Sequence, residues 1–99
     1  MVLGHQRLDP SADPRHLVRN AAEVRGLLER SGKVRSVVTG HQHMGGVNVE
    51  NGITYYSLKA LVCGSGERAN SYAEAAVFAD GAIAVTGWKA AVPYSVPRQ

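Results

Sequence analysis

Two histidines separated by one residue are the strongest sign of chemistry in this chain. His41 and His43 lie in the segment Val37–Gly46, shortly after an apolar run and shortly before a pair of glycines. Glycine lets the backbone turn sharply and pass close to whatever the neighbouring side chains hold. Neutral imidazole is a favoured ligand for zinc, iron, manganese and copper ions. The pattern therefore predicts a metal site at the tip of a strand.

A third histidine, His5, follows another short apolar segment at the start of the chain. If this segment and the apolar run at 34–39 are parallel neighbours joined through a helix, their carboxyl ends lie at one edge of the sheet. His5, His41 and His43 are then expected to converge there. His16 lies in a loop-like stretch, and we interpret it as a hydrogen-bonded or surface residue.

The elements that would position these histidines are readable from residue patterns. Residues 21–31 have helical apolar spacing, with Asn20 as the predicted N-cap, Glu23 in the capping-box position and Gly32 as the stop. The run 34–39 follows as a buried strand.

Two hairpins are expected after the histidine pair. Residues 47–50 and 53–58 flank Asn51-Gly52, and residues 72–79 and 83–88 flank Asp80-Gly81. The predicted fold is α+β: strand, helix and strand, followed by two hairpins. We assign residues 1–92 to one domain and residues 93–99 to a tail that leaves the fold.

Composition narrows the class of protein. The 99 residues are 44% hydrophobic and 19% charged, which is typical of one globular domain. The net charge of +3 comes from scattered basic residues, so a nucleic-acid surface is not expected. Cys63 is the single cysteine, and no apolar run approaches the length of a membrane span. These features favour a cytoplasmic protein.

The motifs resemble those of a known family. Gly40–His43, after its apolar strand, looks like the closing G-H-x-H motif of the calcineurin-like metallophosphoesterases, and Val2–His5 resembles the preceding single-histidine motif. The two hairpins are similar to the strands that follow in these enzymes, so the resemblance covers nearly all of residues 2–90. It implies the C-terminal half of a four-layer α/β/β/α sandwich, most similar to members that cut nucleotide diphosphate linkages.

The resemblance also implies a chemistry. His5 and His41 match ligands of the second of two divalent metals, and His43 matches a ligand of the first. The metals would be manganese, zinc or iron. Together they would activate a hydroxide that hydrolyses a phosphate ester or anhydride in a phosphorylated small molecule, with nucleotide-like compounds among the candidates.

Three family motifs are missing from this sequence. It contains no D-x-H, no G-D-x-x-D and no G-N-H-D/E. The bridging aspartate, the asparagine ligand and the histidine that protonates the leaving group are therefore not supplied. We expect a C-terminal fragment of a longer phosphoesterase, with no catalytic residue of its own and inactive alone.

Two other interpretations stay open. His5, His41 and His43 could close a single zinc site with Asp9 or a water in a small non-catalytic metal-binding or assembly module. They could also be surface histidines of an interaction domain. An upstream reading frame containing the missing motifs would favour the phosphoesterase.

Two charged residues and one strand complete the expectations. Arg7 and Asp9 are candidate substrate-binding residues, since an arginine fork suits phosphate and Asp9 follows His5 closely. The strand at 34–39 is expected to have an exposed edge, which favours a homo-oligomer.

Overall fold

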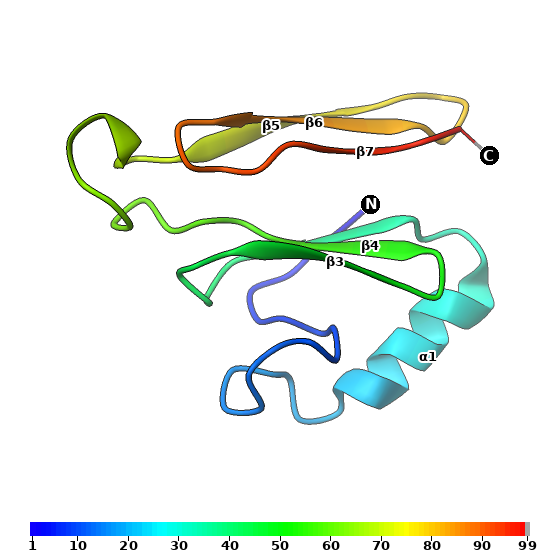
Figure 1. The fold of residues 1–99 in the computed structure, drawn as a ribbon. Helices are drawn as coiled ribbons and strands as arrows, with labels where there is room; N and C mark the ends of the chain where they lie inside the picture. The colour runs from blue at the N-terminus through cyan, green and yellow to red at the C-terminus, as the bar shows by residue number, and fades with distance from the viewer. Residues whose placement is uncertain (99) are drawn as a thin grey trace.

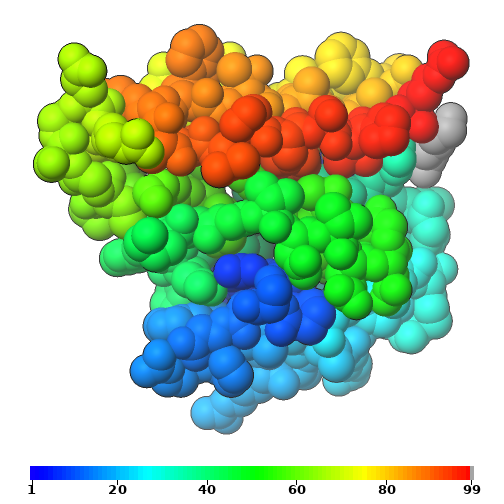
Figure 2. All heavy atoms as spheres, in the orientation of Figure 1, coloured from blue at the N-terminus to red at the C-terminus, as the bar shows by residue number. Residues whose placement is uncertain are grey.

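The computed structural model describes residues 1–98, which form three layers (Figure 1). Helix α1 (Ala21–Ser31) and the loop before it cover one face of a four-stranded sheet, and a three-stranded sheet covers the other face. The space-filling view shows the same stacking (Figure 2). The α+β class and the two-sheet architecture are as predicted. No helix within residues 1–98 is long and apolar enough to cross a membrane.

The first sheet has the order β1-β2-β4-β3. Its strands are β1 (Val2–Leu3), β2 (Ser36–Thr39), β4 (Ile53–Ser57) and β3 (Gly46–Glu50). β1 and β2 are parallel, joined through α1 as predicted, and β2 is also parallel to β4. The exposed edge predicted at 34–39 is therefore wrong in its location: β2 is paired on both sides, and β1 lies at the edge.

The second sheet has the order β5-β6-β7. Its strands are β5 (Tyr72–Val77), β6 (Ile83–Trp88) and β7 (Tyr94–Val96), all antiparallel, and a short 3₁₀ turn, η1 (Gly66–Arg68), precedes them. β7 corrects the expectation that the chain leaves the fold after residue 92. The flanking prolines do not prevent a strand because each lies just outside it. Gln99, the last residue of the expected tail, lies outside the described residues.

Helix α1 has the bounds predicted from its pattern. The predicted stop at its C-terminal end is confirmed, whereas the predicted cap at its N-terminal end is not. Gly32 adopts a left-handed conformation with φ 64° and donates its N–H to the Glu29 carbonyl. Asn20 occupies the N-cap position but makes no side-chain cap hydrogen bond. Its backbone, at φ −99° and ψ 33°, is not the extended conformation from which a capping side chain reaches back. The capping-box prediction is therefore wrong.

Both faces of β4 are buried, which gives the molecule two apolar clusters. Ile53 and Tyr55 pack with Val37 on the helix side of the sheet. Tyr56 packs with residues of β6 and β7 on the opposite side, between the two sheets. Successive side chains of a strand point to opposite faces, so this single strand anchors both layers.

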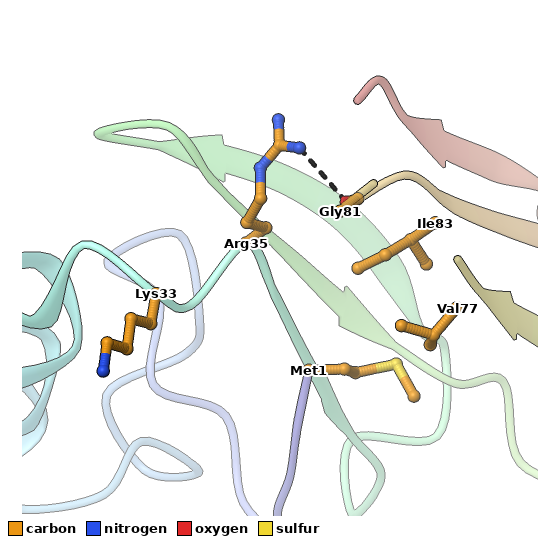
Figure 3. A pocket seen from close by; sticks show the side chains of 6 residues that line it. All are labelled: Met1, Lys33, Arg35, Val77, Gly81 and Ile83. Atoms are coloured by element: carbon orange, nitrogen blue, oxygen red, sulfur yellow. Dashed lines mark hydrogen bonds between the residues drawn. The ribbon is translucent and has the colours of Figure 1, made fainter. Parts of the chain in front are cut away.

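The two sheets are tied together at the amino end of β2. Arg35 donates hydrogen bonds to the backbone carbonyls of Gly81 and Pro97 beside a small pocket of about 130 Å³ (Figure 3). Next to it, the hydroxyls of Ser36 and Tyr94 lie 2.6 Å apart. The carboxyl ends of β1 and β2, after which the histidines follow, lie at the opposite end of these strands.

Candidate metal centre

His5 and His41 lie side by side because the strands before them are parallel neighbours. The ladder between β1 and β2 continues past both strands: Gly4 N–H donates to the Val38 carbonyl at 2.9 Å, and Gly40 N–H donates to the His5 carbonyl at 3.0 Å. Nε2 of His5 then lies 3.1 Å from Nδ1 of His41. The ring centroids are 4.9 Å apart and the rings are steeply inclined, at 68°. The predicted convergence of these two histidines is present in the structure.

The turn after β2 is tight. His41 itself has a positive φ of 61°, which is uncommon for a residue with a side chain. Gly45 has φ +70°, and a Cβ at this position would lie 2.7 Å from the carbonyl oxygen of Ser57. The glycine is therefore required for the turn to return against the end of β4.

His43 belongs to the same surface but has no ring contact with the other histidines. It is exposed, and it lines an open hollow of about 350 Å³ together with His16, His41 and Gln42. Its carbonyl oxygen accepts hydrogen bonds from Ala60 N–H and from the Cys63 thiol, which fix its backbone. The ligand role predicted for His43 stays a prediction.

His16, which the sequence suggested to be a plain loop residue, reaches the centre. Its Nδ1 lies 3.2 Å from Nε2 of His41, on the side of that ring away from His5. The loop returns because Arg7 and Leu17 form a parallel bridge, with Val18 N–H donating to the Arg7 carbonyl. In the sequence, Asp13-Pro14 indicates that the chain turns. No residue spacing, however, reveals where the segment after this turn pairs.

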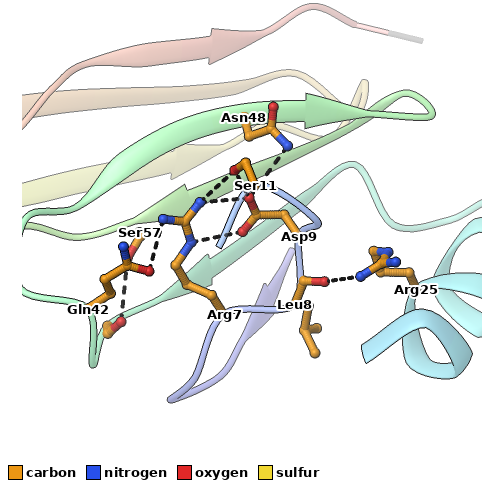
Figure 4. Close-up of polar contacts among 9 residues, drawn as sticks. Arg7, Leu8, Asp9, Ser11, Arg25, Gln42, Asn48 and Ser57 are labelled. Carbon is orange, nitrogen blue, oxygen red and sulfur yellow. Dashed lines mark hydrogen bonds and ion pairs between the residues drawn. The ribbon is translucent and has the colours of Figure 1, made fainter. Parts of the chain in front are cut away.

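Arg7 and Asp9 form a buried ion pair beside the histidine turn (Figure 4). Arg7 Nε and Nη2 donate to the two carboxylate oxygens at 2.9 and 2.6 Å, and Ser11 also donates to the carboxylate. Burial would raise the pKa of Asp9, but the hydrogen bonds from Arg7 and Ser11 and the guanidinium charge outweigh it, so the pKa is lowered. The remaining guanidinium nitrogen donates to Oε1 of Gln42 at 3.1 Å.

Arg7 and Asp9, the two candidate substrate-binding residues, contact each other in the structure. Their charged groups face one another, and their side chains are only 8% and 2% exposed. Because Gln42 lies between the two motif histidines, the pair is connected to the turn through that amide. Substrate binding by either residue stays a prediction.

The spacing of His5 and His41 fits two ligands of one metal ion. With zinc–nitrogen bonds of about 2.0–2.1 Å, two nitrogens on a tetrahedral ion lie about 3.3 Å apart. The observed 3.1 Å between Nε2 and Nδ1 is close to this value. Within residues 1–98, however, no three ligating side chains are gathered tightly enough to hold an ion. The chain thus presents a pair of ligands rather than a closed site.

Comparisons with known proteins identify one solved structure with a similar fold. No protein-family model and no curated protein matches the chain. Among solved structures, the chain is similar to the crystal structure of a dimetal phosphatase from Danio rerio, with a TM-score of 0.88 and 22% sequence identity. The match covers 99% of this chain and 32% of that one, so the chain spans about a third of the length of the structure it matches. The likeness shows that both sheets and the helix occur together within a larger phosphatase fold.

Proposed function

We propose that this chain carries the histidine-bearing part of a metal-dependent phosphoesterase that hydrolyses phosphate esters or nucleotide diphosphate linkages. The observation that carries the proposal is the pair formed by His5 and His41, whose ring nitrogens lie 3.1 Å apart at the carboxyl ends of parallel strands. Open α/β sheets place their sites at such ends. The similar fold of a dimetal phosphatase supports the same assignment.

Each histidine has a distinct part in the proposed site. His5 and His41 would bind one divalent ion, manganese, zinc or iron, and His43 would contribute to a second. Bound metals of this kind supply Lewis acidity, which activates water and neutralises phosphoryl oxygens. Neutral imidazoles suit this task because they bind a cation without adding negative charge. The buried Arg7–Asp9 pair would hold the turn that presents these rings, through Gln42.

A groove next to the histidines supports a small phosphorylated substrate. It has a volume of about 310 Å³, and His41 and His43 line one side of it. Lys59 supplies a cation and Tyr72 an aromatic ring, while Leu58 and Leu61 make the lining apolar. The cation could bind a phosphate group, and the apolar lining could contact a base or another organic group. This combination suits a nucleotide-like ligand. The single cysteine, Cys63, agrees with a cytoplasmic setting for such an enzyme.

The 99-residue chain alone is expected to turn over substrate very slowly or not at all. Among residues 1–98, no carboxylate joins the histidines in a closed metal site. Two imidazoles would leave most coordination positions of an ion to water, and efficient two-metal chemistry needs both ions held in fixed geometry. Activity would belong to an assembly that supplies the remaining ligands.

Metal titration of the chain tests the proposal. Isothermal titration with Mn²⁺ and Zn²⁺ should show binding that His5→Ala and His41→Ala each weaken about tenfold or more, or about 1.4 kcal/mol. Gln6→Ala, at the exposed neighbour of His5, is the control and should bind as the unaltered chain does. Binding that is unaffected by both histidine changes would overturn the assignment.

An activity assay separates the phosphoesterase from a purely structural zinc module. Hydrolysis of bis(p-nitrophenyl) phosphate and of a nucleoside diphosphate ester should be near background for the chain with Mn²⁺. It should rise when a polypeptide that supplies aspartate and asparagine ligands is added. One tightly held zinc and no gain under any such addition would favour the zinc module. Asp9 offers little support for that alternative, since its carboxylate is engaged by Arg7 and Ser11.

A further inference from the structure

Three imidazoles form a line in which His41 is the middle member. Its Nδ1 lies 3.1 Å from Nε2 of His5, and its Nε2 lies 3.2 Å from Nδ1 of His16. Both outer rings are inclined steeply to the middle one, at 68° and 60°. Each ring nitrogen of His41 thus faces a nitrogen of a different histidine.

A neutral imidazole carries one proton, so His41 donates through one nitrogen and accepts through the other. The two hydrogen bonds of His41 can therefore have either of two directions. If the proton is on Nδ1, it points at His5 and blocks the lone pair that a metal would need. If the proton is on Nε2, it is donated to Nδ1 of His16, and the lone pair on Nδ1 of His41 is directed toward His5.

We infer that His16 is a positioning residue that accepts the Nε2–H of His41 and so fixes the tautomer in which Nδ1 carries the lone pair that a metal needs. In the metal-free chain this lone pair accepts a hydrogen bond from Nε2 of His5, and His5 would bind a metal in its Nδ1–H form. This inference deepens the proposed function and rests on it for the identity of His41 as a ligand. Histidine ligands commonly donate their second ring N–H to a neighbouring acceptor, which sets both tautomer and ring orientation. In this chain the acceptor is another imidazole.

The backbone holds His16 in place for this task. Its N–H donates to the Asp13 carbonyl at 2.8 Å, and the bridge between Arg7 and Leu17 pins the following residue to the segment after β1. His16 is partly buried, whereas His5 and His41 are exposed. The acceptor is therefore built into the same loop that departs from His5, so the segment that follows β1 supplies both neighbours of His41.

Long-range ¹H–¹⁵N spectra of the histidine rings in the metal-free chain test the inference directly. The unaltered chain should show His41 protonated at Nε2, and His16→Ala should give a mixture of tautomers. His16→Asn offers an amide oxygen in place of Nδ1 and should restore the Nε2–H form. A His41 protonated at Nδ1 in the unaltered chain would overturn the inference without any variant being needed.

Metal affinity supplies the second readout. His16→Ala should weaken Zn²⁺ and Mn²⁺ binding by about 10–100-fold, the usual effect of losing such a partner. His16→Asn should recover most of that loss, and circular dichroism would verify that both variants fold. If the tautomer depends on His16 but the chain binds no metal, the proposed function fails and the positioning role stands. If metal binds and neither readout responds to His16, the positioning role is wrong.

Discussion

Arg7 and Asp9 are joined by two parallel hydrogen bonds, from Nε to Oδ1 at 2.9 Å and from Nη2 to Oδ2 at 2.6 Å. This fork geometry is the strongest arrangement available to an arginine and a carboxylate. Asn48 of β3 and Ser11 of the loop contact the same carboxylate, and Gln42 contacts the guanidinium. One buried pair therefore connects the loop after β1, the edge strand β3 and the histidine turn.

Breaking this pair should cost much of the stability of the chain. Asp9→Asn leaves a buried guanidinium without its counter-charge, and such losses are typically about 3–5 kcal/mol. Urea unfolding followed by circular dichroism measures the change. Asp13→Asn is the matched control, because Asp13 pairs with Arg15 on the surface, where an ion pair contributes about 1 kcal/mol or less. Equal effects of the two substitutions would contradict the importance of the buried pair.

The same carboxylate should make stability fall in acid. The pKa of Asp9 in the folded chain is lowered from its usual 3.8, so folding favours the ionised form. Its contribution is complete above the unfolded value and is lost as the pH falls through the lower folded value. Unfolding midpoints measured between pH 2 and pH 7 should drop below about pH 4. Asp9→Asn should show a smaller drop over that range, and an identical profile would argue against the assignment.

Substitution of His41 or His43 should affect metal binding without affecting folding. Both residues are exposed, so alanine at either position should change the free energy of unfolding by about 0.5 kcal/mol or less. Each change should weaken the binding of one metal, and in a complete enzyme should reduce turnover strongly. Titration calorimetry paired with urea unfolding separates the two effects. Turnover that survives both substitutions would show that neither residue is a ligand.

Gly45→Ala should distort the histidine turn. The alanine must adopt a positive φ and its Cβ meets the Ser57 carbonyl, so we expect a loss of about 1–3 kcal/mol together with weaker metal binding. Gly52→Ala is the matched control: Gly52 also has a positive φ, of +78°, but nothing lies within 4 Å of its Cβ position. The control should lose less stability and keep its metal affinity. A Gly45→Ala chain that binds metal normally would show that the turn adapts.

The exposed edge at β1 should make the chain self-associate. Leu3 is 72% exposed on this edge. It lines an apolar groove together with Met1 and with Ala73, which belongs to the second sheet. Unpaired strand edges with apolar neighbours pair with other chains. We propose a homodimer or larger oligomer through β1, measurable by light scattering. Leu3→Lys should shift the chain toward monomer, whereas Leu27→Lys, on the exposed face of α1, should not; a monomeric unaltered chain would refute the proposal.

Local patterns predicted most of the fold, and long-range pairing explains the remainder. The helix and the hairpin at Asn51-Gly52 follow from spacing and turn chemistry that act over a few residues. The strand β7 was missed because its pairing with β6, not its own proline-flanked sequence, makes it a strand. The closeness of His5 and His41 could be predicted because the carboxyl ends of parallel neighbouring strands lie at the same edge of a sheet. His16 could not, since only the bridge between Arg7 and Leu17 carries it back.

The shortness of β1 has a consequence for how the site is held. β1 has only two residues in its ladder with β2, and it lies at the edge of the sheet. Short edge elements open locally far more readily than central strands do. A metal held between His5 and His41 would fasten this terminal segment to the sheet, so the ion and the first five residues would order one another. Amide exchange at Gly4 and Gly40 should then slow as metal is added, while the amides of β4 remain unchanged.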